Sequence, residues 1–194
     1  MTARPLILAS SSRYRRALLE RLGIPFTTCT PNVDEAAHSN ERPADTALRL
    51  AVAKARAVAV SNHTALIIGS DQVADLNGTA LGKPGDHPRA VLQLRALRGQ
   101  SVVFHTALCL LDAASGRYQL ESVPSTVRFR DLGDAQIDNY LRREQPYDCA
   151  GSAKIEALGV ALVHHIDSSD PTALIGLPLM ALVTMLQREQ IEVI

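Results

Sequence analysis

Two hydrophobic patterns alternate along the chain: short apolar runs, and stretches in which apolar residues recur every three or four positions. The runs are typical of β-strands, whereas the longer spacing places apolar side chains on one face of an α-helix. The runs predict strands at 5–9, 26–29, 66–68, 73–76, 102–111, 118–129 and 158–166. The periodic stretches predict helices at 14–22, 43–59, 86–97, 133–144 and 177–189.

The order of these elements indicates the fold class. Strands alternate with helices at both ends of the chain, and a long hairpin with its turn at 113–116 lies between them. This order predicts an α/β protein with α+β character, in which helices flank a twisted mixed sheet. We expect residues 1–194 to form one domain with two lobes. The first lobe would hold about the first 100 residues and the C-terminal helix, the second about 101–165, with the site in the cleft between them.

The charge balance restricts the partners. The 194 residues include 20 basic and 20 acidic side chains, so the formal net charge is zero. Such a chain has no general positive field with which to attract a nucleic acid polymer or an anionic membrane. The longest apolar run, 173–186, is interrupted by Gly176 and Pro178 and is too short to span a bilayer. We therefore expect a small anionic partner, and neither nucleic acid nor membrane.

Cysteine usage and the start of the chain indicate the compartment. Cys29, Cys109 and Cys149 are widely spaced and form no C-x-x-C pair. This pattern argues against a disulfide framework and a structural zinc site, and it suits a reducing compartment. The apolar stretch at 5–9 is too short for a signal peptide. We expect a cytoplasmic protein.

Hydroxyl and guanidinium groups gather where the first strand meets the first helix, in the segment Ala9-Ser-Ser-Ser-Arg-Tyr-Arg-Arg16. A strand-to-helix junction presents unpaired backbone N–H groups and the positive end of a helix dipole, and these bind anions such as phosphate. A serine N-cap beside a solvated basic turn is the alternative interpretation.

Acidic residues suggest a second feature. Asp71 follows the apolar run 66–68, at the expected carboxyl end of a buried strand, where ligands collect in open α/β sheets. A carboxylate there can hold a divalent cation or take a proton from water. With Glu35 from the polar loop 31–42 it could complete a magnesium site. The alternative is that Asp71 only caps a turn and that Glu35 only faces solvent.

Three further residues could contribute. Lys54 lies on the predicted helix 43–59, and Lys83 lies between Gly82 and Pro84, where an ammonium group would suit a phosphate. Glu156 follows a small-residue stretch ahead of an apolar run. A solvated lysine and a surface glutamate in a tight loop are the alternative interpretations.

Taken together and in order, these motifs resemble the Maf family of nucleoside triphosphate pyrophosphatases. The matching segments extend across nearly the whole chain, so their joint occurrence is more specific than any one of them. They are Ala-Ser-x-Ser at 9–12 with its arginines, the Asp-Glu pair at 34–35, Leu-Ala and Lys-Ala at 50–55, Gly-Ser-Asp at 69–71, Gly-Lys-Pro at 82–84, Cys-Ala-Gly-Ser at 149–152 and Gly-Leu-Pro-Leu at 176–179. Segments 70–73, 148–152 and 170–171 look like the YceF branch, which implies 7-methyl-GTP as the substrate.

The resemblance implies a reaction and a role for each residue. Members hydrolyse the bond between the α and β phosphates with a divalent metal cation, Mg²⁺ or Mn²⁺. By position, Asp71 would be the catalytic proton acceptor, and Glu35 would assist it at the metal. The triphosphate would be held by Ser10, Ser12, Arg15, Lys54 and Lys83, and base specificity would be set by Tyr14, Gln72 and Glu156. Many members have proline where this chain has Arg13, so the resemblance does not define the exact shape of that loop.

Other activities remain open at this point. A specificity for dTTP, UTP or another modified nucleotide would share all the chemistry and differ only at the base. A nucleotide-binding regulator of cell division that does not turn its ligand over is a rival from another class. The apolar hairpin and closing helix are also compatible with a homodimer.

Overall fold

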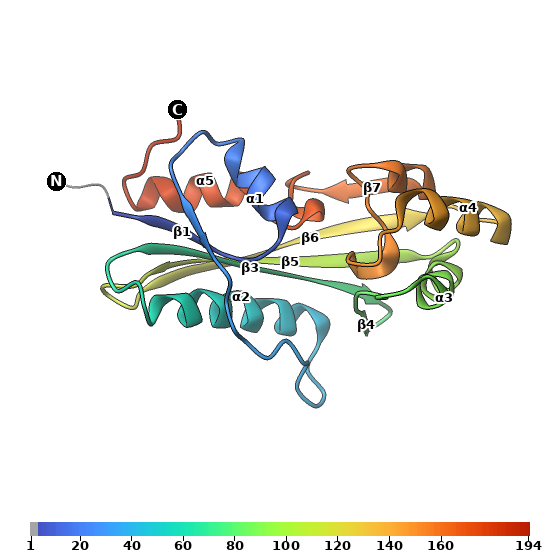
Figure 1. Cartoon of the computed structure of the whole chain (residues 1–194), viewed down its shortest axis with the longest axis horizontal. Helices are drawn as coiled ribbons and strands as arrows, with labels where there is room; N and C mark the ends of the chain where they lie inside the picture. The colour runs from blue at the N-terminus through green and yellow to red at the C-terminus, as the bar shows by residue number, and fades with distance from the viewer. Residues whose placement is uncertain (1–3) are drawn as a thin grey trace.

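A single mixed sheet organises the molecule. The computed structural model describes residues 4–194. Its strands follow the order β2-β1-β3-β5-β6-β7, and a short strand, β4, pairs with the C-terminal end of β3, away from β1 (Figure 1). The strands are β1 Leu6–Ala9, β2 Thr27–Cys29, β3 Leu66–Leu76, β4 Thr79–Leu81, β5 Ser101–Asp112, β6 Tyr118–Phe129 and β7 Val163–Ser168. The helices are α1 Arg13–Glu20, α2 Pro43–Ala59, α3 His87–Leu97, α4 Asp134–Glu144 and α5 Leu179–Arg188.

Strand directions divide the sheet into two parts. β1 pairs in parallel with β2 and β3, whereas β3, β5, β6 and β7 pair antiparallel. Helices cover both faces, with α1 and α5 on one side of the sheet and α2 on the other (Figure 1). The predicted mixed sheet flanked by helices is confirmed. The division into two lobes stays a prediction.

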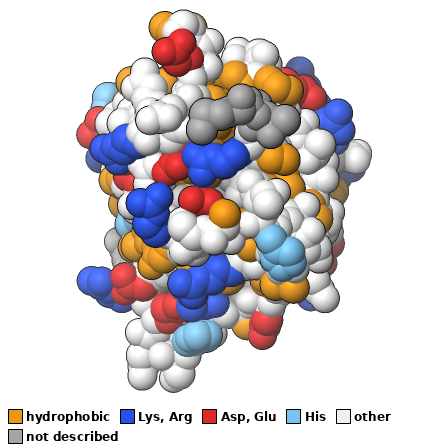
Figure 2. Space-filling view, turned by 90° about the vertical axis from the view of Figure 1, so that its left-hand side faces the viewer, with side chains coloured by type: hydrophobic (Ala, Val, Ile, Leu, Met, Phe, Trp, Pro, Cys, Tyr) orange, Lys and Arg blue, Asp and Glu red, His pale blue; other side chains and the backbone are white. Residues whose placement is uncertain are grey.

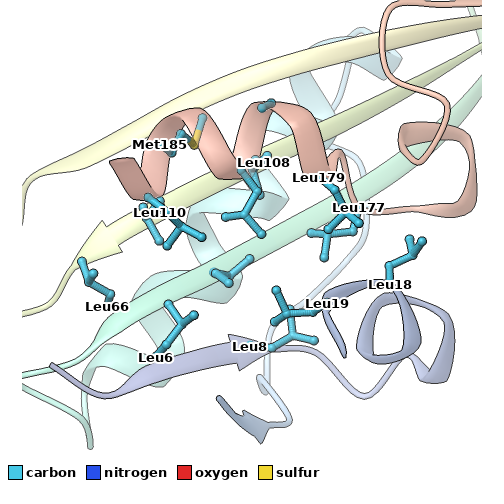
Figure 3. Close-up of a cluster of buried hydrophobic side chains, with 14 of the residues drawn as sticks. Leu6, Leu8, Leu18, Leu19, Leu66, Leu108, Leu110, Leu177, Leu179 and Met185 are labelled. Atoms are coloured by element: carbon cyan, nitrogen blue, oxygen red, sulfur yellow. The ribbon is translucent and has the colours of Figure 1, made fainter. Parts of the chain in front are cut away.

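Alternation along the strands produces a core on each face, because successive side chains point to opposite sides. Leu6 and Leu8 of β1 face α1 and α5, where they meet Leu18 and Leu19 (Figure 3). Ile7 and its alternate neighbours along the sheet face α2. α2 meets the sheet with small residues, so its backbone lies close to the strands. These small residues are Ala47, Ala51 and Ala55.

A third apolar cluster lies at the other end of the sheet. There α3 and α4 pack with the far ends of β5 and β6 around Phe104 and Phe129, both almost fully buried. This cluster supports the loop 145–158, which follows α4 and lines part of the cavity described below.

Two sequence-based predictions are wrong in extent. The runs 66–68 and 73–76 belong to one eleven-residue strand, so Asp71 lies in mid-strand and not at a carboxyl end. The strand predicted at 158–166 begins only at Val163, because Leu158–Leu162 forms a 3₁₀ turn. There the amide N–H of Gly159 donates to the Lys154 carbonyl oxygen at 3.0 Å, and the chain folds back on itself.

The surface agrees with the balanced composition on the face that Figure 2 shows. Basic and acidic side chains are interspersed there with apolar ones, and no large area of one sign appears. Among residues 4–194, no helix has the length and apolar character needed to cross a membrane.

Candidate active site

A gap in the pairing of β3 creates the candidate site. β5 pairs with one side of β3 along nearly its whole length. On the other side, β1 accompanies β3 only as far as Gly69, and β4 only from Ala74 onward. Within the described chain, residues 70–73 therefore have no strand beside them on that side. The chain leaving β1 at Ser10 and the chain leaving β4 at Gly82 both lie next to this gap.

Asp71 forms the floor of the gap and is linked to a buried lysine. The Lys54 Nζ donates to Asp71 Oδ1 at 2.6 Å and lies 2.6 Å from Glu35 Oε1. Lys54 is only 5% exposed, and a buried ammonium group is tolerated only when it is paired. One cation therefore holds two carboxylates together, and their bonded oxygens cannot be farther apart than twice that distance.

The serine turn forms the N-cap of α1, which is the alternative interpretation of this segment, and its role in binding an anion stays a prediction. Ser12 caps α1 by accepting from the Arg15 amide at 3.4 Å, and the Ser12 amide donates to Ser10 Oγ at 3.0 Å. The Arg15 guanidinium turns toward the sheet, where its Nε donates to the Gly176 carbonyl oxygen at 2.8 Å. Ser70 Oγ donates to the same oxygen at 3.0 Å. Burial lowers the pKa of Arg15, while the charges of nearby Asp71 and Glu35 oppose that shift.

A clamp on α2 holds the loop that carries Glu35. Arg49 Nε and Nη2 contact the two carboxylate oxygens of Glu41 at 2.6 and 2.7 Å, and Nη2 also donates to the Ala36 carbonyl oxygen at 2.9 Å. Partial burial opposes ionisation of Glu35. The hydrogen bond and charge of Lys54, with help from Lys83 and Arg15, nevertheless lower the pKa of Glu35. Glu35 is thus held ionised beside Asp71.

Lys83 lines the same cavity. It is exposed on the segment that follows β4, and the neighbouring Gly82 carbonyl oxygen accepts from Gln93 Nε2 of α3 at 2.9 Å. This bond fixes the backbone beside Lys83. The ammonium group can therefore move over the cavity while its backbone stays in place.

Gln72, next to Asp71, is oriented by the loop before α5. Its Nε2 lies within 3.0 Å of Thr106 Oγ1 and of the Ala173 and Leu174 carbonyl oxygens. These three oxygens accept from the amide nitrogen of the Gln72 side chain. In the hydrogen bonds of residues 4–194 its Oε1 accepts none, so the carbonyl oxygen is available to a ligand.

All ten residues predicted for the site line one cavity of about 770 Å³. The same cavity is lined by Arg13, Asp148, Cys149 and Gly176, to which sequence reasoning gave no role. Asp148 and Gly176 lie inside motifs that the sequence analysis singled out, yet their side-chain and carbonyl contacts depend on segments more than 100 positions away. The predicted residues are Ser10, Ser12, Tyr14, Arg15, Glu35, Lys54, Asp71, Gln72, Lys83 and Glu156.

Fold and cavity together define an α/β protein with a cleft whose walls carry ammonium, guanidinium and hydroxyl donors around a pair of carboxylates. The chain belongs to the Maf family: the family model described as Maf-like protein matches residues 5–189. Three relatives carry the name 7-methyl-GTP pyrophosphatase. The protein from Burkholderia lata is 60% identical over 94% of this chain and 88% of its own length. Those from Thiobacillus denitrificans and Methylobacillus flagellatus are 56% and 57% identical, over 100% and 98% of this chain and 96% and 99% of their own lengths.

Proposed function

We propose that this chain hydrolyses 7-methyl-GTP between the α and β phosphates, releasing 7-methyl-GMP and pyrophosphate. Relatives named for that activity align over nearly the whole chain. One observation supports the chemistry most directly: the Asp71 carboxylate lies in the cavity floor, paired with Lys54, beneath the serine turn and Lys83. Such an enzyme would remove methylated nucleotides from the nucleotide pool.

Asp71 is the proton acceptor in this proposal. A carboxylate that lines a cavity can take a proton from a water molecule as that water attacks a phosphorus atom. Lys54 keeps the Asp71 carboxylate in one orientation, and the mid-strand backbone fixes its height in the cavity. The triphosphate lies against Ser10, Ser12, Arg15, Lys54 and Lys83, whose donors stabilise the charge that develops on the phosphate oxygens.

A divalent cation, Mg²⁺ or Mn²⁺, suits the carboxylate pair. Magnesium is commonly held by one or two carboxylates together with substrate phosphates and water. Glu35 and Asp71 offer such a pair, because Lys54 holds the two carboxylates together through one oxygen of each. Among the hydrogen bonds and ion pairs of residues 4–194, the other oxygens, Glu35 Oε2 and Asp71 Oδ2, have no partner. When bound, the metal would polarise the phosphates. Glu35 and Asp71 are the residues that would hold it.

Tyr14, Gln72 and Glu156 set the base specificity in this proposal. Methylation at N7 places positive charge on guanine, which favours an aromatic ring face and a carboxylate. Tyr14 supplies the ring, Glu156 the carboxylate and Gln72 a carbonyl acceptor, and all three line the cavity. Unmethylated GTP offers the same donors without the charge.

The setting of the enzyme is also part of the proposal. All three cysteines are free thiols, which suits a reducing cytoplasm. A homodimer remains compatible with the exposed apolar residues of β6, β7 and α5, among them Leu120, Ile166 and Met180. Light scattering on the purified chain would show whether it forms.

The test is a nucleotide panel assayed for released pyrophosphate with Mg²⁺ or Mn²⁺. Wild type should cleave 7-methyl-GTP in preference to GTP, dTTP and UTP, and chelation should stop turnover without unfolding the chain. Asp71→Asn should keep the fold and lose nearly all turnover, because an amide can neither accept the proton nor offer a full negative charge.

Asp75→Asn is the matched control, since Asp75 lies on the same strand, outside the cavity lining, beside His105. It should retain turnover. Substantial hydrolysis by Asp71→Asn would assign the base elsewhere, and a wild type that prefers dTTP or UTP would refute the proposed substrate.

A further inference from the structure

A cation already occupies the aromatic corner of the cavity. The Arg13 guanidinium carbon lies 4.8 Å from the centroid of the Tyr14 ring, and Arg13 Nη2 donates to Tyr14 Oη at 2.8 Å. The same Nη2 lies 3.4 Å from Asp148 Oδ2, on the loop after α4. A flat positive group therefore rests on the ring with a carboxylate beside it.

The Tyr14 phenol and the Cys149 thiol in this corner are uncharged at neutral pH. The face of the Tyr14 ring and the Asp148 carboxylate therefore provide the attraction for a cation. Burial raises the pKa of Tyr14. Burial also raises the pKa of Cys149, whose Sγ lies 3.6 Å from Asp148 Oδ1, to about 12. Tyr14 thus stays a phenol and Cys149 a thiol. Asp148 contributes the negative charge next to the ring.

These contacts match the properties of an N7-methylated guanine. That base is flat and carries positive charge, as the guanidinium group does, and both prefer an aromatic face with an anion nearby. One face of the Tyr14 ring can hold only one flat cation at a time. Arg13 must therefore leave this position when a methylated base takes it.

Exposure makes this exchange feasible. The side chains of Arg13 and Asp148 are 73% and 54% exposed, so their ion pair is screened by water and is easily broken. By contrast, the buried pair of Lys54 and Asp71 lies deeper in the cavity. A cationic base can thus replace Arg13 beside Tyr14 and Asp148 while the Lys54–Asp71 pair stays unchanged.

Building on the proposed function, we infer that Asp148 is a further specificity residue, which recognises the positive charge of the methylated base, and that Arg13 competes with the base for Tyr14 and Asp148. The selectivity of the enzyme then depends on this competition as well as on direct contacts.

The test measures the ratio of kcat/KM for 7-methyl-GTP to kcat/KM for GTP. Using a ratio cancels any attraction of these side chains for the triphosphate, which both substrates share. Asp148→Asn should lower the ratio about tenfold, as expected for loss of a charge-assisted contact. Arg13→Ala should raise it about twofold to fivefold, as expected when an exposed cation–π competitor is removed.

Matched variants separate charge recognition from other effects. Asp148→Glu keeps the negative charge and should retain most of the preference. Asp131→Asn and Arg16→Ala make the same charge changes at exposed positions outside the cavity lining, and they should leave the ratio unchanged.

The outcomes distinguish this inference from the proposed function. A wild type that prefers 7-methyl-GTP, with a ratio unaltered in Asp148→Asn and Arg13→Ala, would overturn the inference alone. Equal losses on both substrates in Asp148→Asn would assign Asp148 to the triphosphate or to folding, and so would overturn it too. A wild type without preference for 7-methyl-GTP would overturn both.

Discussion

Gly69 lies directly against Ala51: a Cβ atom added to Gly69 would come within 2.1 Å of the Ala51 carbonyl oxygen and 2.9 Å of the Ala55 amide nitrogen. Strand β3 and helix α2 therefore touch through their backbones. This close approach brings Lys54, one turn along α2, within hydrogen-bonding distance of Asp71, two positions along β3.

We predict that Gly69→Ala is strongly destabilising. The added methyl group must push α2 away from the sheet, and overpacking of this kind costs about 1–3 kcal/mol. Turnover should fall as well, because Lys54 moves with the helix. Denaturant unfolding and pyrophosphate release would measure the two effects. Gly82→Ala, where an added Cβ meets nothing within 4 Å, should unfold like wild type; equal stability of the two variants would contradict the close-contact argument.

The two lysines should behave differently when replaced. Lys54→Met removes the cation between Asp71 and Glu35, and breaking a buried ion pair costs about 3–5 kcal/mol. The pKa of Glu35 should rise, because its main stabilising partner is Lys54. A lower unfolding midpoint, near-complete loss of turnover and NMR titration of the Glu35 carboxyl would report these changes.

Lys83→Ala should leave the fold intact, since Lys83 is exposed. It should mainly weaken binding and charge stabilisation, by a several-fold to about hundredfold loss in kcat/KM. Arg89→Ala, an exposed cation on α3 outside the cavity lining, is the control. Unfolding of Lys83→Ala, or an equal kinetic loss in Arg89→Ala, would argue against a role at the phosphates.

Stability should decrease in acid through the clamp on the Glu35 loop. The Arg49 side chain, the His38 amide and the Thr46 hydroxyl lower the pKa of Glu41 from 4.5 to about 2. Because the pKa is lower in the folded state, the stabilisation is complete above pH 4.5 and is lost as the pH falls toward 2.

Replacing Glu41 by glutamine should flatten the stability profile in that window. Denaturant midpoints measured between pH 5 and 2 would show a smaller decline than in wild type. Glu20→Gln, which alters an exposed pair with Arg16 on α1, should follow the wild-type slope. A Glu41→Gln profile as steep as wild type would assign the acid sensitivity to other carboxylates.

Asp170 should matter for the site without touching it. Its buried carboxylate accepts from the Thr172 amide at 2.9 Å and the Met180 amide at 2.7 Å, and so shapes the turn that offers the Gly176 carbonyl oxygen to Arg15. In Asp170→Asn, the side-chain NH2 group would face the backbone N–H of Thr172 or Met180, which then loses its acceptor. Such an unpaired buried donor lowers the free energy of unfolding by about 1–3 kcal/mol.

Thermal unfolding of Asp170→Asn should therefore occur about 3–10 °C lower than in wild type. KM should rise, because Arg15 loses its fixed orientation. Asp167→Asn, exposed on neighbouring β7, should show neither change. A variant as stable as wild type would mean that the turn holds its shape without the carboxylate.

Much of the fold follows from local patterns. Helix α2 begins and ends at the residues that the three-to-four spacing of apolar residues predicts. The face that this spacing defines is also the face that packs against the sheet, so the local pattern and the tertiary contacts favour the same helix. The 3₁₀ turn at 158–162 could not be predicted, because Leu158, Val160 and Leu162 alternate as in a strand. Its shape depends on the Leu158 amide donating to Glu144 on α4, at 3.2 Å.

In the candidate site, too, some features were predictable from the sequence and others depend on contacts between distant segments. Family motifs gave the ten residues, and all line the cavity, while their roles stay predictions. The prediction that Asp71 lies at the carboxyl end of a strand was wrong, because the polar sequence 69–72 resembles a strand end. Only the pairing register shows that β5 continues alongside it. The contacts of Arg13 with Asp148 join positions 135 residues apart, and no local pattern predicts them.

The mid-strand position of Asp71 has a consequence for how such enzymes diversify. In the proposed function the reactive carboxylate is on a strand that continues on both sides of it, so it has little freedom to shift. The surrounding walls, by contrast, include five connecting segments, at 10–12, 31–37, 82–83, 148–156 and 174–176. Under the proposed function, substitutions in the wall segment 148–156 can change which nucleobase is admitted while Asp71 keeps its position on β3.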